Sequence, residues 1–275
     1  MTAHQDCVGF LQWCLQRIGL RWPGYRRVHR LVCKRLNRRK AELGLGDFAE
    51  YRSWIEAHPD EWARIDAMCR IPISRFCRDR DVFAALGATV LSAAAALAVR
   101  QERDTIRCWS AGCAAGEEPY SLVLAWHYQV AHDWPDIALR VIGTDADEMA
   151  ISRAGMACYT ASSLKELPEC WRQTAFQRRS GLLCLKPELR DCVELRLQDV
   201  RTAMPDGPFG IILCRNLAFT YFAAAMQQQV LTGMLDRLVS GGFLVLGKHE
   251  ALPEGAYGLT RLSPALPIFR FAGLQ

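Results

Sequence analysis

The sequence predicts an α/β fold in which a doubly wound, Rossmann-like domain follows a small all-helical N-terminal domain. From Ile106 onward, apolar strand-like segments alternate with helical segments, which is the pattern of a parallel sheet. Residues 1–72 instead contain short segments with apolar side chains at helical spacing. A chain of 275 residues can hold one large and one small domain, and we place them at 73–275 and 1–72.

The helical domain has recognisable start and stop signals. A capping-box pattern at 47–50 begins one helix, and the dipeptide His58-Pro59 ends it. Asp60 begins a second helix, which stops at Pro72. The domain boundary is therefore expected close to Pro72, and the residues after it are expected to line the cleft of the larger domain.

Residues 106–121 carry the most specific signal in the chain. A strand-like run leads into a tight turn that contains Gly112 and Gly116, and a helix begins at Glu117. A strand, a glycine turn and a helix N-terminus together form the nucleotide-binding corner of a doubly wound fold. The alternative is a purely structural turn whose glycines serve packing.

The composition of this turn excludes a triphosphate as its ligand. The turn has no Gly-Lys-Ser/Thr, and Glu117 and Glu118 stand where a phosphate site would need a cation. Two carboxylates repel pyrophosphate but can hold an ammonium or a sulfonium group. S-Adenosylmethionine has an amine on its amino-acid end and a positive sulfur, so the turn points to this cofactor.

Three further apolar runs end in polar residues. The first ends at Asp145, where doubly wound folds hydrogen-bond ribose hydroxyls. The other two are followed by Asp199 and by the pair Arg215-Asn216. Because the carboxyl ends of parallel strands meet at one edge of a sheet, these groups are expected to converge on one crevice. The three runs are 139–145, 192–197 and 209–214.

With these segments in place, the sequence resembles the CheR-type chemoreceptor methyltransferases. The matching stretches follow the family's order over nearly the whole chain, and AGC-x-x-GEEPYS is the most specific of them. They are SRFCRD at 74–79, WSAGCAAGEEPYS at 109–121, GTDAD at 143–147, FGIILCRN at 209–216 and GGFLVLGKHE at 241–250. The resemblance implies a Rossmann-like methyltransferase domain that uses S-adenosylmethionine and releases S-adenosylhomocysteine.

The resemblance also implies roles for individual residues. Ser74 and Arg78 would contact the cofactor near its reacting end, and Arg78 and Tyr221 would be the catalytic residues, with Tyr221 beside the substrate carboxyl. Glu117 would take the methionine amine, and Asp145 would bind the ribose hydroxyls. The other implied cofactor-binding positions are Gly112, Gly116, Asp199, Val200, Arg215 and Asn216.

Some positions depart from the family's pattern. Pro72 replaces a common Asn and so removes a backbone donor, and Asp199 replaces an amide with a charge. The segment 217–222 is one residue longer than its counterpart, so Tyr221 need not reach the same point. Residues 247–250 read Gly-Lys-His-Glu in place of Gly-His-Ser-Glu.

Several of the implied roles have structural alternatives. Arg78 could pair with Asp79 or Asp81 instead of contacting the cofactor. Tyr221 could be an ordinary core aromatic. His249-Glu250 could be either a loop pair or part of the active site.

Positive charge is concentrated near the N-terminus. Residues 1–46 contain ten Lys/Arg and two Asp/Glu, a local balance of +8 against +5 for the whole chain. Much of it lies on a predicted helix, Tyr25–Glu42, and the candidate docking residues there are Arg30, Lys34, Arg35, Arg38 and Arg39. The family resemblance implies that this helix docks an acidic helix of a receptor. The alternatives are a solvated basic face, with the Arg35 and Arg39 stems covering the edge of the core, and a nucleic-acid surface, although no aromatic stacking pattern accompanies the charge.

Composition and cysteine spacing indicate a reduced cytoplasmic protein. The N-terminus, MTAHQDC, lacks the basic and apolar regions of a secretory signal. None of the twelve cysteines is spaced as C-x-x-C, so we expect neither structural zinc nor a disulfide framework. The uncharged run 82–99 is long enough to span a membrane, but its many alanines and small polar residues favour a buried core helix.

We therefore expect an S-adenosylmethionine-dependent methyltransferase of CheR type that O-methylates glutamate carboxylates on a chemoreceptor-like signalling protein. One alternative is a divergent enzyme on the same fold that methylates a small molecule or a peptide amine, with His249 or Glu250 as the base. Another is a noncatalytic module that binds the cofactor and docks a partner.

Overall fold

The computed structural model describes residues 3–255 and 257–273. The chain divides into two compact units, of which the first joins Met1–Ile71 to Thr220–Gln227. The second joins Pro72–Phe219 to Gln228–Gln275. The sequence placed a domain boundary close to Pro72, and it did not indicate that residues 220–227 group with the N-terminal helices.

The first unit is helical. Its N-terminal helices are α1 (Ala3–Arg17), α2 (Trp22–Tyr25), α3 (His29–Glu42), α4 (Phe48–Ala57) and α5 (Glu61–Cys69). The predicted cap of α4 is confirmed, because the Asp47 side chain accepts from the Glu50 N–H at 2.8 Å. Apolar side chains from each helix meet in a core that includes Leu11, Leu15, Tyr25, Leu36, Tyr51, Ile55 and Ile65.

The basic helix begins later than the sequence predicted. The predicted span Tyr25–Glu42 is wrong at its start, because α2 ends at Tyr25 and α3 begins only at His29. Pro23 occupies the first turn of the short α2, a position that proline favours. The Tyr25 ring is buried and its hydroxyl donates to the Cys69 carbonyl at 3.1 Å, which anchors the end of α2.

The second unit contains the predicted doubly wound sheet. Its seven strands are ordered β6-β2-β1-β7-β8-β10-β9. The first five strands run parallel, whereas β10 is antiparallel to both of its neighbours. The strands are β1 (Thr105–Ala111), β2 (Ala138–Asp145), β6 (Val193–Leu197), β7 (Phe209–Cys214), β8 (Leu238–Leu246), β9 (Leu259–Ser263) and β10 (Leu266–Phe271).

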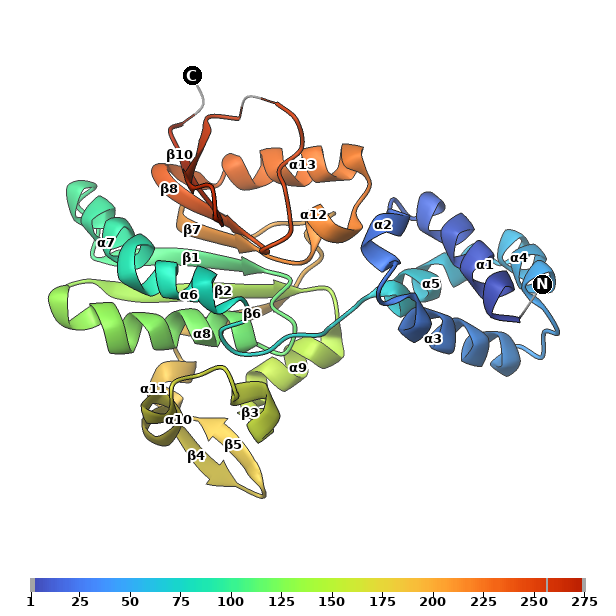
Figure 1. Ribbon diagram of the computed structural model, residues 1–275, viewed down its shortest axis with the longest axis horizontal. Coiled ribbons are helices and arrows are strands. Elements are labelled where there is room, and N and C mark those ends of the chain that lie inside the picture. The colour runs from blue at the N-terminus through green and yellow to red at the C-terminus, as the bar shows by residue number, and fades with distance from the viewer. Residues whose placement is uncertain (1–2, 256, 274–275) are drawn as a thin grey trace. The chain divides into compact units, whose positions relative to one another are not determined.

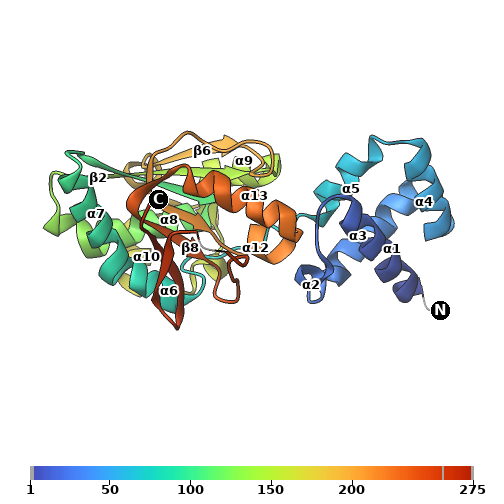
Figure 2. The same ribbon diagram turned by 90° about the horizontal axis from the view of Figure 1, so that it is seen from above.

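Helices cover both faces of this sheet. In Figures 1 and 2, α6 (Arg80–Ala85), α7 (Leu91–Arg100) and α8 (Glu117–Ala125) lie on one face, and α13 (Ala224–Leu235) lies on the other. The reversal in strand order falls between β1 and β7, so the carboxyl ends of these two strands flank the topological switch point. Doubly wound folds bind their ligands at this point.

The apolar run after Asp79 forms a helix on the sheet, as predicted. The helix is continuous from Arg80 to Arg100, with a π-helical turn at Leu86–Val90 between α6 and α7. Among the described residues it is the one helix long and apolar enough to cross a membrane, and 56% of its most apolar window is buried in the protein. Its buried side chains belong to the same core cluster as Ile106 and Ile211 of the sheet.

An insertion between β2 and β6 forms a second, smaller sheet that the sequence did not reveal. Its strands β3 (Cys158–Tyr159), β5 (Leu182–Leu185) and β4 (Phe176–Arg179) follow α9 (Glu148–Met156), and they appear below the main sheet in Figure 1. The short helices α10 (Glu169–Ala175) and α11 (Pro187–Arg190) accompany it. These strands are too short to give a clear alternating pattern.

The expectation that all cysteines are free is corrected. The structure joins Cys7 of α1 to Cys33 of α3, and Cys158 of β3 to Cys184 of β5. Both pairs are separated by 26 residues, so spacing at the level of C-x-x-C could not reveal them. Eight further cysteines are free, and among the described residues no cluster of His, Cys, Asp or Glu is placed to hold a metal ion.

Candidate functional site

The glycine turn follows directly from the carboxyl end of β1. Gly112 and Gly116 have φ values of +75° and +91°, which favour glycine. A Cβ at Gly112 would lie 2.7 Å from the Leu217 side chain, and one at Gly116 would lie 2.7 Å from the Tyr120 ring. Both glycines are therefore required by backbone conformation and by close packing.

Asp145 holds this turn from the end of the neighbouring strand. One carboxylate oxygen accepts from the Ala114 N–H at 2.8 Å, and the other accepts from the Asp147 N–H at 2.9 Å. A carboxylate oxygen has two lone pairs and can accept more than one hydrogen bond. Asp145 thus shapes the turn, and its predicted contact with the ribose hydroxyls stays a prediction.

Glu117 is the most informative side chain of the site. It is the first residue of α8 and is only 7% exposed, yet its Oε2 atom is buried without a hydrogen-bond partner. Burial raises the pKa of this carboxyl above its usual value, and backbone N–H groups of the turn oppose that effect. A buried carboxylate oxygen with no partner is costly unless a ligand supplies one, and the amine of an amino-acid ligand fits this need.

Glu118 has a different role from the one that the sequence indicated. It accepts from Ser110 Oγ at 2.8 Å and from Arg215 Nη1 at 3.1 Å. Adjacent helical residues point about 100° apart, so only one member of the Glu117-Glu118 pair can face the turn. Glu118 neutralises a buried cation, whereas Glu117 has an oxygen without a partner, and its predicted contact with the cofactor amine stays a prediction.

That cation, Arg215, lies at the centre of a buried ionic network. Its side chain is 2% exposed, and besides Glu118 it contacts Asp79 Oδ2 at 2.8 Å and the Arg78 carbonyl at 2.6 Å. These protein groups bind both terminal nitrogens of its guanidinium, whereas Nε is buried without a hydrogen-bond partner, and the predicted contact of Arg215 with the cofactor stays a prediction. Arg215 ties the end of β7 to the segment that carries Ser74 and Arg78.

The segment before α6 is anchored by its apolar residues. Phe76 is buried with its ring edge-on to Tyr159 and Phe176, and the Cys77 N–H donates to Ser121 Oγ at 2.9 Å. Arg78 is partly exposed and donates to the Ile73 carbonyl at 3.0 Å, rather than pairing with Asp79 or Asp81. Ser74 is also partly exposed, so the polar residues of this segment remain accessible.

Asn216 closes the switch point beside β8. It has a left-handed backbone conformation, φ +56°, and its N–H donates to Glu250 Oε2 at 2.8 Å. The same oxygen accepts from the Gly247 N–H at 2.7 Å, and Glu250 is 8% exposed. Glu250 therefore fixes the turn after β8, whereas the adjacent His249 is exposed.

The remaining predicted residues are placed as follows. The Asp199 carboxylate is bound by the Arg201 guanidinium, with the shortest distance at 2.6 Å, while Val200 is 7% exposed. Tyr221 belongs to the first unit, where its ring packs against Tyr25 with centroids 5.0 Å apart. Its predicted role beside the substrate stays a prediction.

A doubly wound sheet with an acidic glycine turn and a buried, unpartnered glutamate at its switch point defines the class of S-adenosylmethionine-dependent methyltransferases. The comparison with protein families agrees, because the family described as "CheR methyltransferase, SAM binding domain" matches residues 73–264. The chain belongs to this CheR methyltransferase family. Its cofactor is S-adenosylmethionine, which supplies an electrophilic methyl group on a positive sulfur.

Curated relatives cover most of the chain. A chemotaxis protein methyltransferase from Listeria innocua is 31% identical over 226 residues, which are 82% of each protein. The Salmonella typhimurium chemotaxis protein methyltransferase is 30% identical over 87% of this chain and 81% of its own length. An uncharacterized 104.1 kDa protein of Rhodobacter capsulatus is 30% identical over 81% of this chain, which spans only 23% of that protein.

Among solved structures, the N-methyltransferase NodS from Bradyrhizobium japonicum WM9, in complex with S-adenosylhomocysteine, is 17% identical over 61% of this chain and 60% of its own. The TM-score is 0.33. This similarity is too weak to add to the family assignment.

The position of Asp145 gives a first prediction about cofactor affinity. Asp145→Ala removes the predicted acceptor for the ribose hydroxyls and releases the Ala114 N–H that shapes the turn. We expect S-adenosylhomocysteine affinity, measured by calorimetry, to fall by about 1.5–3 kcal/mol, the usual range for hydrogen bonds to charged groups. Unchanged affinity of Asp145→Ala would place the adenosine elsewhere. A loss of affinity in Asp145→Ala that is absent from Asp147→Ala would support an adenosine site beside Asp145.

Proposed function

We propose that this chain transfers the methyl group of S-adenosylmethionine to glutamate side chains of a chemoreceptor-like signalling protein. The observation that carries the proposal is the similarity to chemotaxis protein methyltransferases, at 30–31% identity over more than four-fifths of the chain. A cytoplasmic location is part of the proposal, because a receptor of this kind presents its signalling helices there.

The chemistry of the site supports a carboxylate nucleophile. A glutamate is already ionised at neutral pH, so the transfer needs no general base. An amine must first lose a proton, and the two candidates for its base were His249 and Glu250. Glu250 is buried and accepts from the N–H groups of Gly247 and Asn216, so its role is to hold the turn. Alignment and water exclusion are then the main tasks of the protein.

The bond formed by the reaction distinguishes the proposed substrate from its alternatives. We expect methyl-labelled cofactor to label a protein band in receptor-containing membranes, and we expect mild alkali to release the label as methanol. Methylation of a peptide amine would give an alkali-stable label, and a small-molecule substrate would leave the protein fraction unlabelled. Either outcome would contradict the proposal, and Glu117→Gln provides the inactive control.

The basic helix α3 favours an acidic partner, but fewer of its basic residues are available for docking than the sequence suggested. Arg35 donates to the carbonyls of Met68 and Arg70 at 2.8 and 2.6 Å, and Arg39 forms a two-pronged pair with Glu61. The guanidinium groups of these two arginines therefore hold α3 to α5. The exposed basic residues that remain for docking are Arg30, Lys34 and Arg38.

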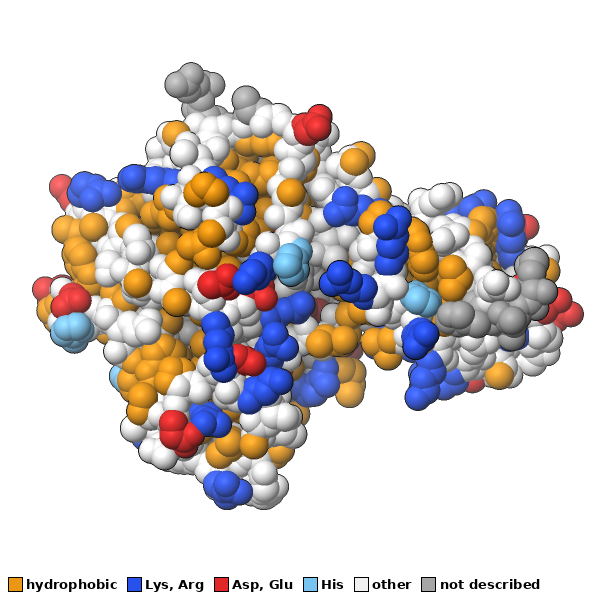
Figure 3. All heavy atoms as spheres, viewed as in Figure 1, with side chains coloured by type: hydrophobic (Ala, Val, Ile, Leu, Met, Phe, Trp, Pro, Cys, Tyr) orange, Lys and Arg blue, Asp and Glu red, His pale blue; other side chains and the backbone are white. Residues whose placement is uncertain are grey.

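The exposed face of α3 has a shape that suits an acidic side chain. A shallow hollow of about 310 Å³ is lined by Arg30, Lys34, Asn37 and Cys33. Basic side chains recur over the visible face of the helical unit in Figure 3. We infer that acidic residues of the receptor helix bind along this face.

This assignment predicts a charge-dependent partner interaction. Arg30→Glu with Lys34→Glu should raise KM for receptor-containing membranes. The increase in KM should be largest at low salt, because added salt screens exposed charges, which interact over roughly 8–10 Å at physiological ionic strength. Cofactor affinity and folding should change little, since exposed substitutions cost about half a kcal/mol or less. The matched control is Arg100→Glu with Arg140→Glu, an equal charge change on exposed arginines of the other unit. An equal effect of both double variants would contradict docking by α3.

A further inference from the structure

A second pocket lies at the opposite end of β1 from the glycine turn. It has a volume of about 450 Å³, and the residues that form it include Leu97, Gln101, Arg103, Ile106, Pro208 and Val239. This volume falls within the range of roughly 300–1,000 Å³ that is typical of small-molecule sites. Because β1 has seven residues, the pocket and the turn are separated by about 20 Å along the strand.

The base of the pocket is apolar. Leu97 and Ala98 come from the last turns of α7, Ile106 from the start of β1, and Val239 from the start of β8. All four are at most 9% exposed, so they form a fixed surface rather than mobile side chains. Such a surface suits the hydrocarbon body of a ligand.

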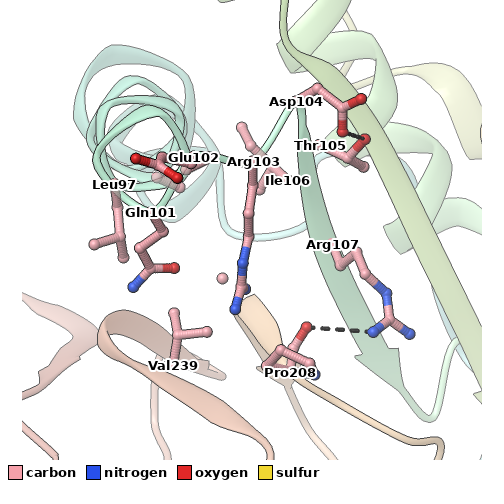
Figure 4. Close-up of a pocket in the computed structure, with 13 residues that line it drawn as sticks. Leu97, Gln101, Glu102, Arg103, Asp104, Thr105, Ile106, Arg107, Pro208 and Val239 are labelled. Carbon is pink, nitrogen blue, oxygen red and sulfur yellow. Dashed lines mark hydrogen bonds between the residues drawn. The ribbon is translucent and has the colours of Figure 1, made fainter.

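The polar side chain that enters the pocket is Arg103. Figure 4 shows its guanidinium reaching into the open space between Gln101, Val239 and Pro208. Within residues 3–255 and 257–273, the structure records no hydrogen bond or ion pair for this side chain. By contrast, the Arg107 guanidinium donates to the Asp206 carbonyl at 2.9 Å and stacks over Phe209, so it forms part of the wall.

The nearby negative groups do not neutralise Arg103. The carboxylates of Glu102 and Asp104 point away from its guanidinium in Figure 4, and Asp104 accepts from Thr105 Oγ1 at 2.9 Å. The carbonyls at the end of α7 are also occupied, because those of Leu97, Ala98 and Val99 accept backbone N–H groups of residues 101–103. The charge presented to a ligand is therefore positive.

We propose that this pocket is a binding site for a small organic anion with an apolar body, such as an aromatic carboxylate or sulfonate. Arg103 holds the anionic group, and Gln101, which also lines the pocket, offers its side-chain amide as a second donor. Leu97, Ile106 and Val239 contact the apolar body. The site is separate from the cofactor crevice and can be filled while the cofactor is bound.

The proposal is tested with 8-anilinonaphthalene-1-sulfonate, an aromatic sulfonate whose fluorescence rises when it enters an apolar site. We expect saturable binding of one probe molecule to the folded protein, with no displacement by S-adenosylhomocysteine. Arg103→Glu should weaken probe binding about tenfold or more, because the charge-assisted hydrogen bond becomes a repulsion. Arg103→Lys should retain part of the affinity.

Two further variants locate the probe. Val239→Trp fills the apolar base and should also prevent binding, whereas Arg100→Glu reverses an exposed charge at the end of α7, outside the pocket, and should not. Arg103 is exposed, so its substitution leaves the fold intact even if Val239→Trp does not fold. The proposal is overturned if binding is absent, if S-adenosylhomocysteine displaces the probe, or if Arg103→Glu and Arg100→Glu bind it equally well.

Discussion

Glu117→Gln is expected to weaken cofactor binding and, at the same time, to make the ligand-free protein more stable. The wild-type carboxylate has a buried oxygen without a partner, which a cofactor amine would pair. Glutamine keeps an oxygen for the backbone N–H groups of the turn but loses the charge. We expect calorimetry to show a loss of about 1.5–3 kcal/mol in S-adenosylhomocysteine affinity, roughly ten- to a hundredfold.

A ligand comparison makes this prediction specific to the amine. 5′-Methylthioadenosine lacks the amino-acid end of the cofactor, so Glu117→Gln should scarcely change its affinity. The wild-type protein should strongly prefer S-adenosylhomocysteine, and the variant should lose most of that preference. An equal loss for both ligands would show that the substitution distorts the turn instead of removing an ion pair.

The ionisation of Glu117 makes the stability of the wild-type protein depend on pH in a defined direction. Burial raises the pKa of Glu117 in the folded protein above its unfolded value, so the folded state binds the proton more readily. Wild-type stability should therefore fall as pH rises from the unfolded pKa through the raised folded pKa. Cofactor binding needs the ionised carboxylate and should weaken as pH falls through the same range. Glu117→Gln should flatten both dependences in urea and binding titrations.

Arg215→Met is expected to give the largest loss of folding stability. Its removal leaves Glu118 and Asp79, both largely buried, without their shared cation. Breaking a buried ion pair by deleting one partner costs about 3–5 kcal/mol. Urea denaturation measures this loss, and near-wild-type stability would contradict the central role of Arg215 in the network.

Two comparisons separate the cost of breaking the buried ion pairs from the cost of removing any arginine side chain. Arg215→Met combined with Glu118→Gln should be more stable than Arg215→Met alone, because one uncompensated buried charge is removed. Arg201→Met deletes an arginine whose partner, Asp199, is two residues away and partly exposed, and it should cost only about 1 kcal/mol. Similar losses for Arg201→Met and Arg215→Met would contradict the distinction.

The sequence predicted the parallel strands and the glycine turn because those features are local. Buried parallel strands read as continuous apolar runs, and a turn between a strand and a helix needs glycine at fixed positions. The strands β1, β2, β6 and β7 therefore lie within a few residues of their expected limits. The insertion with β3, β4 and β5 has strands too short to carry such a pattern.

The use of each charged residue could not be predicted in the same way, because it depends on contacts distant in the chain. Arg215 and Glu118 are 97 residues apart, and Arg35 contacts carbonyls more than 30 residues away. A sequence motif places these side chains near a site but does not say which of them bind one another. Glu117 and Glu118 are adjacent and chemically identical, yet only one of them lacks a partner.

The assembly of the helical unit from two distant stretches has a consequence for protein synthesis. Leu20 forms a β-bridge with Phe222, and the Arg21 N–H donates to the Tyr221 carbonyl at 2.8 Å. A ribosome exposes the first 71 residues long before residues 220–227 emerge, so the N-terminal helices must wait for the segment that completes them. A nascent chain halted before residue 220 should expose the surface around Leu20 to chaperones, and release from them should coincide with translation past Gln227.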